Sequence, residues 1–76
     1  MIRFQYINEN IINIKKDIRA GILPSSLLRY YAIYSRLDYY KKLSNSITKA
    51  VFLTSEDFKV SERTIFRIIK NMEEEI

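Results

Sequence analysis

VFLTSEDFKVSERTIFRIIK, residues 51–70, is the stretch of sequence that decides the fold. From Ile65 onward, apolar residues recur at i, i+3 and i+4, which is the spacing of one helix face. Ser61 precedes that face and is a preferred N-cap residue, because its hydroxyl oxygen can accept a backbone N–H of the first turn. The pattern predicts a helix over residues 62–74 that follows another over residues 45–58, which we expect to be capped by the preceding serine.

The connection between these two helices has the features of a helix-turn-helix. Two helices that cross over a turn of about three or four residues need apolar side chains to hold the second against the first. We expect Ser55 to be the small residue at the inside of the corner and Phe58 to close the first helix. The residues expected to hold the second helix are Val60, Ile65 and Ile68.

Two further helices are predicted before this unit, over residues 8–20 and 26–42. A stripe of isoleucines at helical spacing supports the first of them. We expect Asn8 to cap its start, and Gly21 lies just past its end, where a left-handed backbone favours glycine. Residues 1–7 alternate as in a strand but also extend the helical stripe, so strand, helix and free arm all stay open.

The predicted helix over residues 26–42 is apolar on nearly all sides. Such a helix is either central in a fold or shared with another chain. We therefore expect a homodimer or a higher homo-oligomer through this helix, with Phe52 and Leu53 extending the surface. Stacking of nucleic-acid bases on its aromatic rings is the alternative. The tyrosines in question are Tyr30, Tyr31, Tyr34, Tyr39 and Tyr40.

Composition narrows the class of protein. With 76 residues the chain is one domain, and a single Gly and a single Pro favour an all-α fold of about four helices over a many-stranded sheet. We expect residues 1–43 to form a helical pair and residues 44–76 the helix-turn-helix. The absence of Cys and His excludes disulfides, zinc fingers and imidazole catalysis. We expect no enzyme, metal or cofactor, and we interpret Asp38 as a partner in a structural salt bridge.

No apolar run is long enough to span a membrane, and the first residues lack the layout of a signal peptide, so we expect a cytoplasmic protein. The net charge is +4, although Glu73, Glu74 and Glu75 follow one another near the C-terminus. A basic body favours a polyanionic partner, while a merely solvated basic surface is the alternative. The glutamates are expected to form a frayed end; the alternative is an acidic tail that competes for the basic face.

Residues 60–67, Val-Ser-Glu-Arg-Thr-Ile-Phe-Arg, resemble the signature of homeodomain-like helix-turn-helix proteins. They are similar to the DNA-binding ends of serine recombinases and to phage middle-operon activators. The stronger part of the resemblance covers residues 44–76. More weakly, the whole chain resembles small helix-turn-helix proteins of phages and mobile elements, in which a Tyr-rich helix precedes the same signature.

This resemblance implies sequence-specific binding of double-stranded DNA, as in a small transcriptional regulator that reads the major groove with the helix over residues 62–74. It implies that Ser61 is both the cap and a phosphate ligand, and that Arg63, Thr64 and Arg67 face the groove. Lysines around the helix, including Lys49, are expected to reach phosphates. The full candidate set is Lys59, Ser61, Glu62, Arg63, Thr64, Arg67, Lys70 and Asn71.

The sequence departs from the family pattern at several positions. Lys59 stands where a glycine with positive φ is usual. Phe52 and Leu53 occupy places that are usually charged, and Thr54 stands where an apolar residue is expected. A second hypothesis follows, in which the chain is an oligomerisation or interaction module, for example in phage assembly or DNA packaging, and the helix-turn-helix is only a scaffold.

Overall fold

The computed structural model describes residues 1–75, and these form five α-helices joined by short turns. The helices are α1 (Arg3–Glu9), α2 (Ile11–Arg19), α3 (Ser26–Ser44), α4 (Ile47–Phe58) and α5 (Glu62–Met72). The predicted all-α class is confirmed. Within residues 1–75, β-type backbone pairing is limited to one isolated bridge between Ile2 and Glu75. Across this same part of the chain, no helix combines the length and apolarity needed to cross a membrane.

The extra helix arises at Asn10, which divides the predicted helix over residues 8–20. Asn10 has φ −115° and ψ 21°, and its side-chain amide donates to the carbonyl of Tyr6 at 2.8 Å. Asparagine favours such local bonds over the helical ladder, which explains the break. Asn8 is therefore not an N-cap but lies inside α1. The N-terminal segment is helical from Arg3, and the predicted pair of helices is a set of three.

Gly21 ends α2 as predicted, with φ +79°. Its N–H donates to the carbonyl of Ile18 at 3.1 Å, and the N–H of Ile22 donates to the carbonyl of Asp17 at 2.9 Å. These two bonds form a Schellman motif, which satisfies the last carbonyls of the helix. The chain then turns back through residues 22–25 into α3.

The turn between α3 and α4 differs from prediction by two residues. Asn45 takes the left-handed conformation, with φ +59°, and ends α3. Ser46, not Ser44, caps α4, since its hydroxyl accepts the N–H of Lys49 at 3.3 Å. The hydroxyl of Ser44 instead donates to the carbonyl of Tyr40 at 2.8 Å. The helix predicted from residue 45 therefore begins at Ile47.

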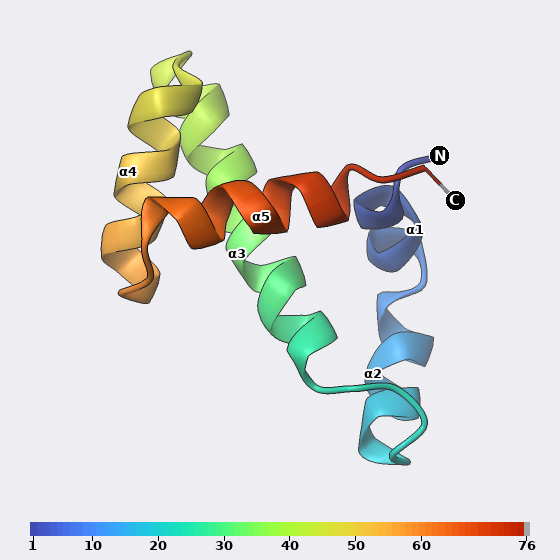
Figure 1. The fold of residues 1–76 in the computed structure, drawn as a ribbon. Coiled ribbons are helices and arrows are strands. Elements are labelled where there is room, and N and C mark those ends of the chain that lie inside the picture. The colour runs from blue at the N-terminus through green and yellow to red at the C-terminus, as the bar shows by residue number, and fades with distance from the viewer. Residues whose placement is uncertain (76) are drawn as a thin grey trace.

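α3 and α4 run side by side in opposite directions, and α5 lies across them with its far end beside α1 (Figure 1). The described ends of the chain meet next to α1. The core fills the space between these four helices. Its buried apolar residues are Ile7, Ile14, Ile33, Tyr34, Leu37, Ala50, Val51, Ile65, Ile68 and Met72.

Several tyrosines of α3 pack against or hydrogen-bond to other helices of the same chain. Tyr34 is buried, with its ring centroid 4.5 Å from that of Phe4 in α1. Tyr31 stacks on the same Phe4 ring at 5.5 Å, and its hydroxyl donates to the Asn8 amide oxygen at 2.6 Å. Tyr40 donates to the Asp57 carboxylate at 2.5 Å, a bond that raises the pKa of the Tyr40 hydroxyl. Helix α3 is thus apolar on several sides because α1, α4 and α5 all pack on it.

The three consecutive glutamates are not a frayed end. Glu73 accepts a hydrogen bond of 2.7 Å from the Tyr34 hydroxyl. Glu74 accepts the Arg3 backbone N–H at 2.8 Å, and its carboxylate lies 3.4 Å from the Arg3 guanidinium. Glu75 lies 3.2 Å from the amino group of Met1. These contacts fasten the end of α5 to α3, 39 positions away, and to the segment containing α1, more than 70 positions away. No local pattern reveals them.

Candidate nucleic-acid interface

One face of α5 is fixed in the core. Ile65 and Met72 are fully buried and Ile68 nearly so. Phe58 and Val60, on either side of the turn, pack against the same core. The residues predicted to hold this helix therefore do so. Because the buried face is held along the whole length of α5, the opposite face has a defined orientation toward solvent.

The turn before α5 contains a strained residue. Lys59 has φ +55° and ψ 44°, the left-handed conformation that glycine adopts without a steric cost. The N–H of Val60 donates to the carbonyl of Ser55 at 3.2 Å and closes the turn. Ser55, the small residue predicted at the inside of this corner, is half-buried, and its carbonyl accepts the bond that closes the turn. Ala50 and Thr54 are the fully buried small residues of α4.

Ser61 caps α5 as predicted. Its Oγ accepts the Thr64 N–H at 3.1 Å and lies 2.9 Å from the Thr64 hydroxyl oxygen. The Thr64 hydroxyl is therefore engaged by Ser61 at the surface, and its side chain is half-buried. When Thr64 donates in the hydroxyl pair, the proton of the Ser61 hydroxyl remains available for an anion. Glu62 follows in the first turn, where a carboxylate stabilises the helix.

The exposed face of α5 is cationic. Arg63, Arg67 and Lys70 lie at i, i+4 and i+7 and are all exposed. Within residues 1–75, none of the three forms an ion pair or a side-chain hydrogen bond. Of the other predicted residues, Lys59 and Glu62 are exposed and Asn71 is half-buried beside Lys70.

Phe66 also lies on this face, although the spacing of apolar residues in the sequence groups it with the apolar positions of the helix. Its side chain is 54% exposed. It follows Arg63 by three residues and precedes Lys70 by four, so the ring lies among the cations on the helix surface. The signal in the sequence is an aromatic residue at a helix position that faces away from the core. That position can be recognised only once the buried face of α5 is known.

A carboxylate borders the far end of the basic face. Arg67, Lys70, Asn71 and Glu74 line a shallow groove with a volume of about 280 Å³. Glu74 is already paired with Arg3, so its charge is partly compensated. Arg63 is the one cation of this face that does not line the groove with Glu74.

The residues of α4 that the sequence singled out lie on different sides of the helix. Thr54 faces the core, and its hydroxyl has no hydrogen-bond partner among the described residues. Phe52 is half exposed and Leu53 is half-buried. Lys49 is exposed on the same helix. Thr54 thus belongs to the core, whereas Phe52 places an apolar ring at the surface.

The one carboxylate of α3 has a structural partner. Asp38 pairs with Lys42 at 3.0 Å, which confirms the predicted salt bridge. In residues 1–75, no group of three or more carboxylates is positioned to hold a metal ion.

Comparison of the chain with protein-family models, with curated proteins and with solved structures finds no match. What the chain binds is therefore inferred from its own residues. The most distinctive surface is the outer face of α5, which combines three cations, an aromatic ring and a side-chain amide on a rigid helix.

Proposed function

We propose that this chain binds double-stranded DNA by placing α5 in the major groove, as a small transcriptional regulator of a phage or mobile element. The observation that carries the proposal is the exposed row of Arg63, Arg67 and Lys70. These cations have no carboxylate partner within residues 1–75, and they project from a helix whose other face is buried. Unpaired basic side chains on a fixed helix are the surface that a polyanion requires.

The dimensions and chemistry agree with this placement. An α-helix with its side chains is about 10–12 Å wide, and the major groove is about 12 Å wide. Arg63 and Arg67 are suited to donate two hydrogen bonds each to guanine, while Lys59 and Lys70 are suited to neutralise phosphates. Phe66 offers an apolar contact to a thymine methyl group. Asn71 contributes an amide at the edge of the same face, while Glu62 stabilises the start of α5.

Binding as a dimer would extend the short site that one helix covers. Two copies that read half-sites about one DNA turn apart gain affinity and specificity together. On α3, the side chains that remain exposed along one face are Ala32, Arg36, Tyr39 and Leu43. This face, rather than the whole Tyr-rich helix, is the surface we propose for contact between copies, because α1 and α4 already cover the other sides.

A second candidate function is a protein interaction module. The observation that favours it is the exposure of three large apolar side chains, Leu43, Phe52 and Phe66, one on each of α3, α4 and α5. In that case Phe66 and the arginines around it contact a protein partner, and the helix-turn-helix arrangement serves only as support.

Alanine variants of the two arginines distinguish the candidates. If Arg63 and Arg67 each bond a guanine, Arg63→Ala and Arg67→Ala each weaken binding to a selected DNA site by about 1–3 kcal/mol. Lys15→Ala, an exposed cation on α2, is the matched control for a loss of general charge. Equal losses in all three variants would show that the binding is nonspecific electrostatic attraction. If the native chain does not bind DNA at all, the result would favour the interaction module.

A further inference from the structure

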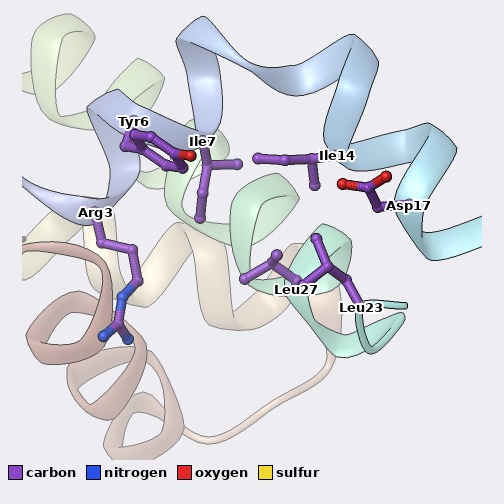
Figure 2. A pocket seen from close by; sticks show the side chains of 7 residues that line it. All are labelled: Arg3, Tyr6, Ile7, Ile14, Asp17, Leu23 and Leu27. Carbon is purple, nitrogen blue, oxygen red and sulfur yellow. The ribbon is translucent and has the colours of Figure 1, made fainter. Parts of the chain in front are cut away.

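A second concave surface lies away from the outer face of α5, between α1, α2 and the start of α3 (Figure 2). It has a volume of about 400 Å³, which is within the range of about 300–1,000 Å³ typical of small-molecule sites. We call it the N-terminal groove. Its lining residues are Arg3, Tyr6, Ile7, Ile14, Asp17, Leu23 and Leu27.

Backbone hydrogen bonds fix the shape of this groove. The break at Asn10 separates the directions of α1 and α2, so that Ile7 and Ile14 line the same hollow from two helices. The Asp17 carbonyl accepts the N–H groups of Ile22 at 2.9 Å and of Leu23 at 3.3 Å. These bonds hold the side chain of Leu23 opposite α2, so the groove is formed before any ligand arrives.

Most of the lining is apolar. Ile7 and Ile14 form one wall, and Leu23 and Leu27 face them from the other side (Figure 2). Ile7 and Ile14 are only 2% and 6% exposed, so a ligand removes apolar surface from water mainly at the half-buried Leu23 and Leu27, which stabilises the bound state by about 25 cal/mol per Å² buried. The walls therefore favour a ligand with a hydrocarbon body.

The two ionic residues of the lining differ in their availability. The Arg3 guanidinium lies 3.4 Å from the Glu74 carboxylate and points away from Asp17 (Figure 2). The Asp17 carboxylate is half-buried at the other end of the groove, and no side-chain hydrogen bond or ion pair engages it within the described chain. The groove thus offers one uncompensated negative charge beside an apolar surface.

We propose that the N-terminal groove binds a small amphipathic organic cation, an alkyl or aryl amine whose ammonium group pairs with Asp17 and whose apolar body lies between the isoleucines and leucines. The Tyr6 ring borders the groove beyond Ile7 and adds an aromatic surface for the far end of the ligand. An anion of the same shape is disfavoured, because it meets the Asp17 charge while Arg3 is already paired.

Three probes of similar length test this chemistry: hexylamine, hexanol and hexanoate. They are titrated into the isotope-labelled native chain, and backbone and methyl NMR shifts are recorded. We expect hexylamine to shift the resonances of Ile7, Ile14, Leu23 and Leu27 in a saturable way. Hexanol should bind about fivefold more weakly, the factor that a partly exposed ion pair contributes, and hexanoate more weakly still.

Two variants tie the result to Asp17. Asp17→Asn removes the charge but keeps the shape, so hexylamine should then bind no better than hexanol. Glu56→Gln, which removes an exposed carboxylate from α4, should leave the hexylamine affinity unchanged. The proposal is overturned if hexylamine and hexanol bind the native chain equally, or if the shifts occur away from the groove. Groove resonances that move with protein concentration alone would also overturn it, because they assign the groove to a second copy.

Discussion

The hydroxyl of Tyr34, near the middle of α3, donates a hydrogen bond of 2.7 Å to the carboxylate of Glu73, the residue that ends α5. The ring of Tyr34 is buried while Glu73 is exposed, so the bond joins the core to the surface at the end of the proposed DNA-binding helix. Burial raises the pKa of the Tyr34 hydroxyl above the ordinary value of 10.0, and the bond to the negative Glu73 raises it further. The proton held by Tyr34 thus contributes one bond that fastens the end of α5 to α3.

This bond predicts a pH dependence of stability. Because the pKa of Tyr34 is raised in the folded state, its contribution is fully present below about pH 10 and is lost as the pH rises toward the folded-state pKa. Tyr34→Phe should lower the free energy of unfolding by about 1 kcal/mol near pH 8. The difference between variant and native chain should shrink above pH 10. Urea unfolding at several pH values measures this, and a constant difference up to pH 11 would contradict it.

Thr54 predicts a stabilising substitution. Its hydroxyl is buried and has no partner within residues 1–75, and a buried polar group without a hydrogen bond costs about 1–3 kcal/mol. Thr54→Val keeps the branched shape and removes that cost, so the free energy of unfolding should rise by about 1 kcal/mol or more. Thr48→Val, at an exposed position of the same helix, is the control and should change little. A destabilised Thr54→Val variant would show that the hydroxyl has a partner in solution.

The sequence predicts much of this fold because its local signals agree with one another. Ser61 and Gly21 have the conformations that their residue types favour, and the apolar spacing of α5 identifies its buried residues correctly. The break at Asn10 was not predicted, because an asparagine within an isoleucine stripe is compatible with a continuous helix. The bonds of Glu73 and Glu74 were also missed, since they join segments that are distant in sequence and depend on how α5 crosses the core.

Lys59 predicts a second stabilising substitution. A residue other than glycine in the left-handed conformation costs about 1 kcal/mol. Lys59→Gly should therefore raise the free energy of unfolding by up to about 1 kcal/mol, less the added chain entropy of glycine. Asn45→Gly is the matched comparison, because Asn45 has a similar φ of +59° but asparagine tolerates it better. Thermal unfolding of both variants should show the larger gain at Lys59, and a loss there would contradict the strain.

The two faces of α5 lead us to predict unequal losses of stability for two neighbouring substitutions. Ile65 is fully buried, whereas the next residue, Phe66, is 54% exposed. Ile65→Ala should cost about 2–5 kcal/mol of folding free energy, because it leaves a cavity in the core. Phe66→Ala should cost less than about 1 kcal/mol. Denaturant unfolding of the two neighbours compares them directly, and a larger cost at Phe66 would show that α5 is rotated from the orientation described.

The sequence predicts which charged residues form the candidate site but not how the residues between them are arranged. The spacing of Arg63 and Arg67 is enough to place both on one helix face opposite Ile65. The engagement of the Thr64 hydroxyl by Ser61 and the outward position of Phe66 depend on the phase and capping of α5. These details shift the proposed base contacts from Thr64 toward Phe66 and the two arginines.

The central claim, that α5 binds DNA through its basic face, is tested most directly by fluorescence anisotropy of a DNA duplex across a salt series. Each phosphate neutralised contributes about −0.9 to the slope of log affinity against log salt concentration. We predict a slope of several units for the native chain, reduced by about 1 in Lys70→Ala, and a loss of site preference in Arg63→Ala. Absence of binding at low salt, or a slope that Lys70→Ala and Lys59→Ala both leave unchanged, would contradict the claim.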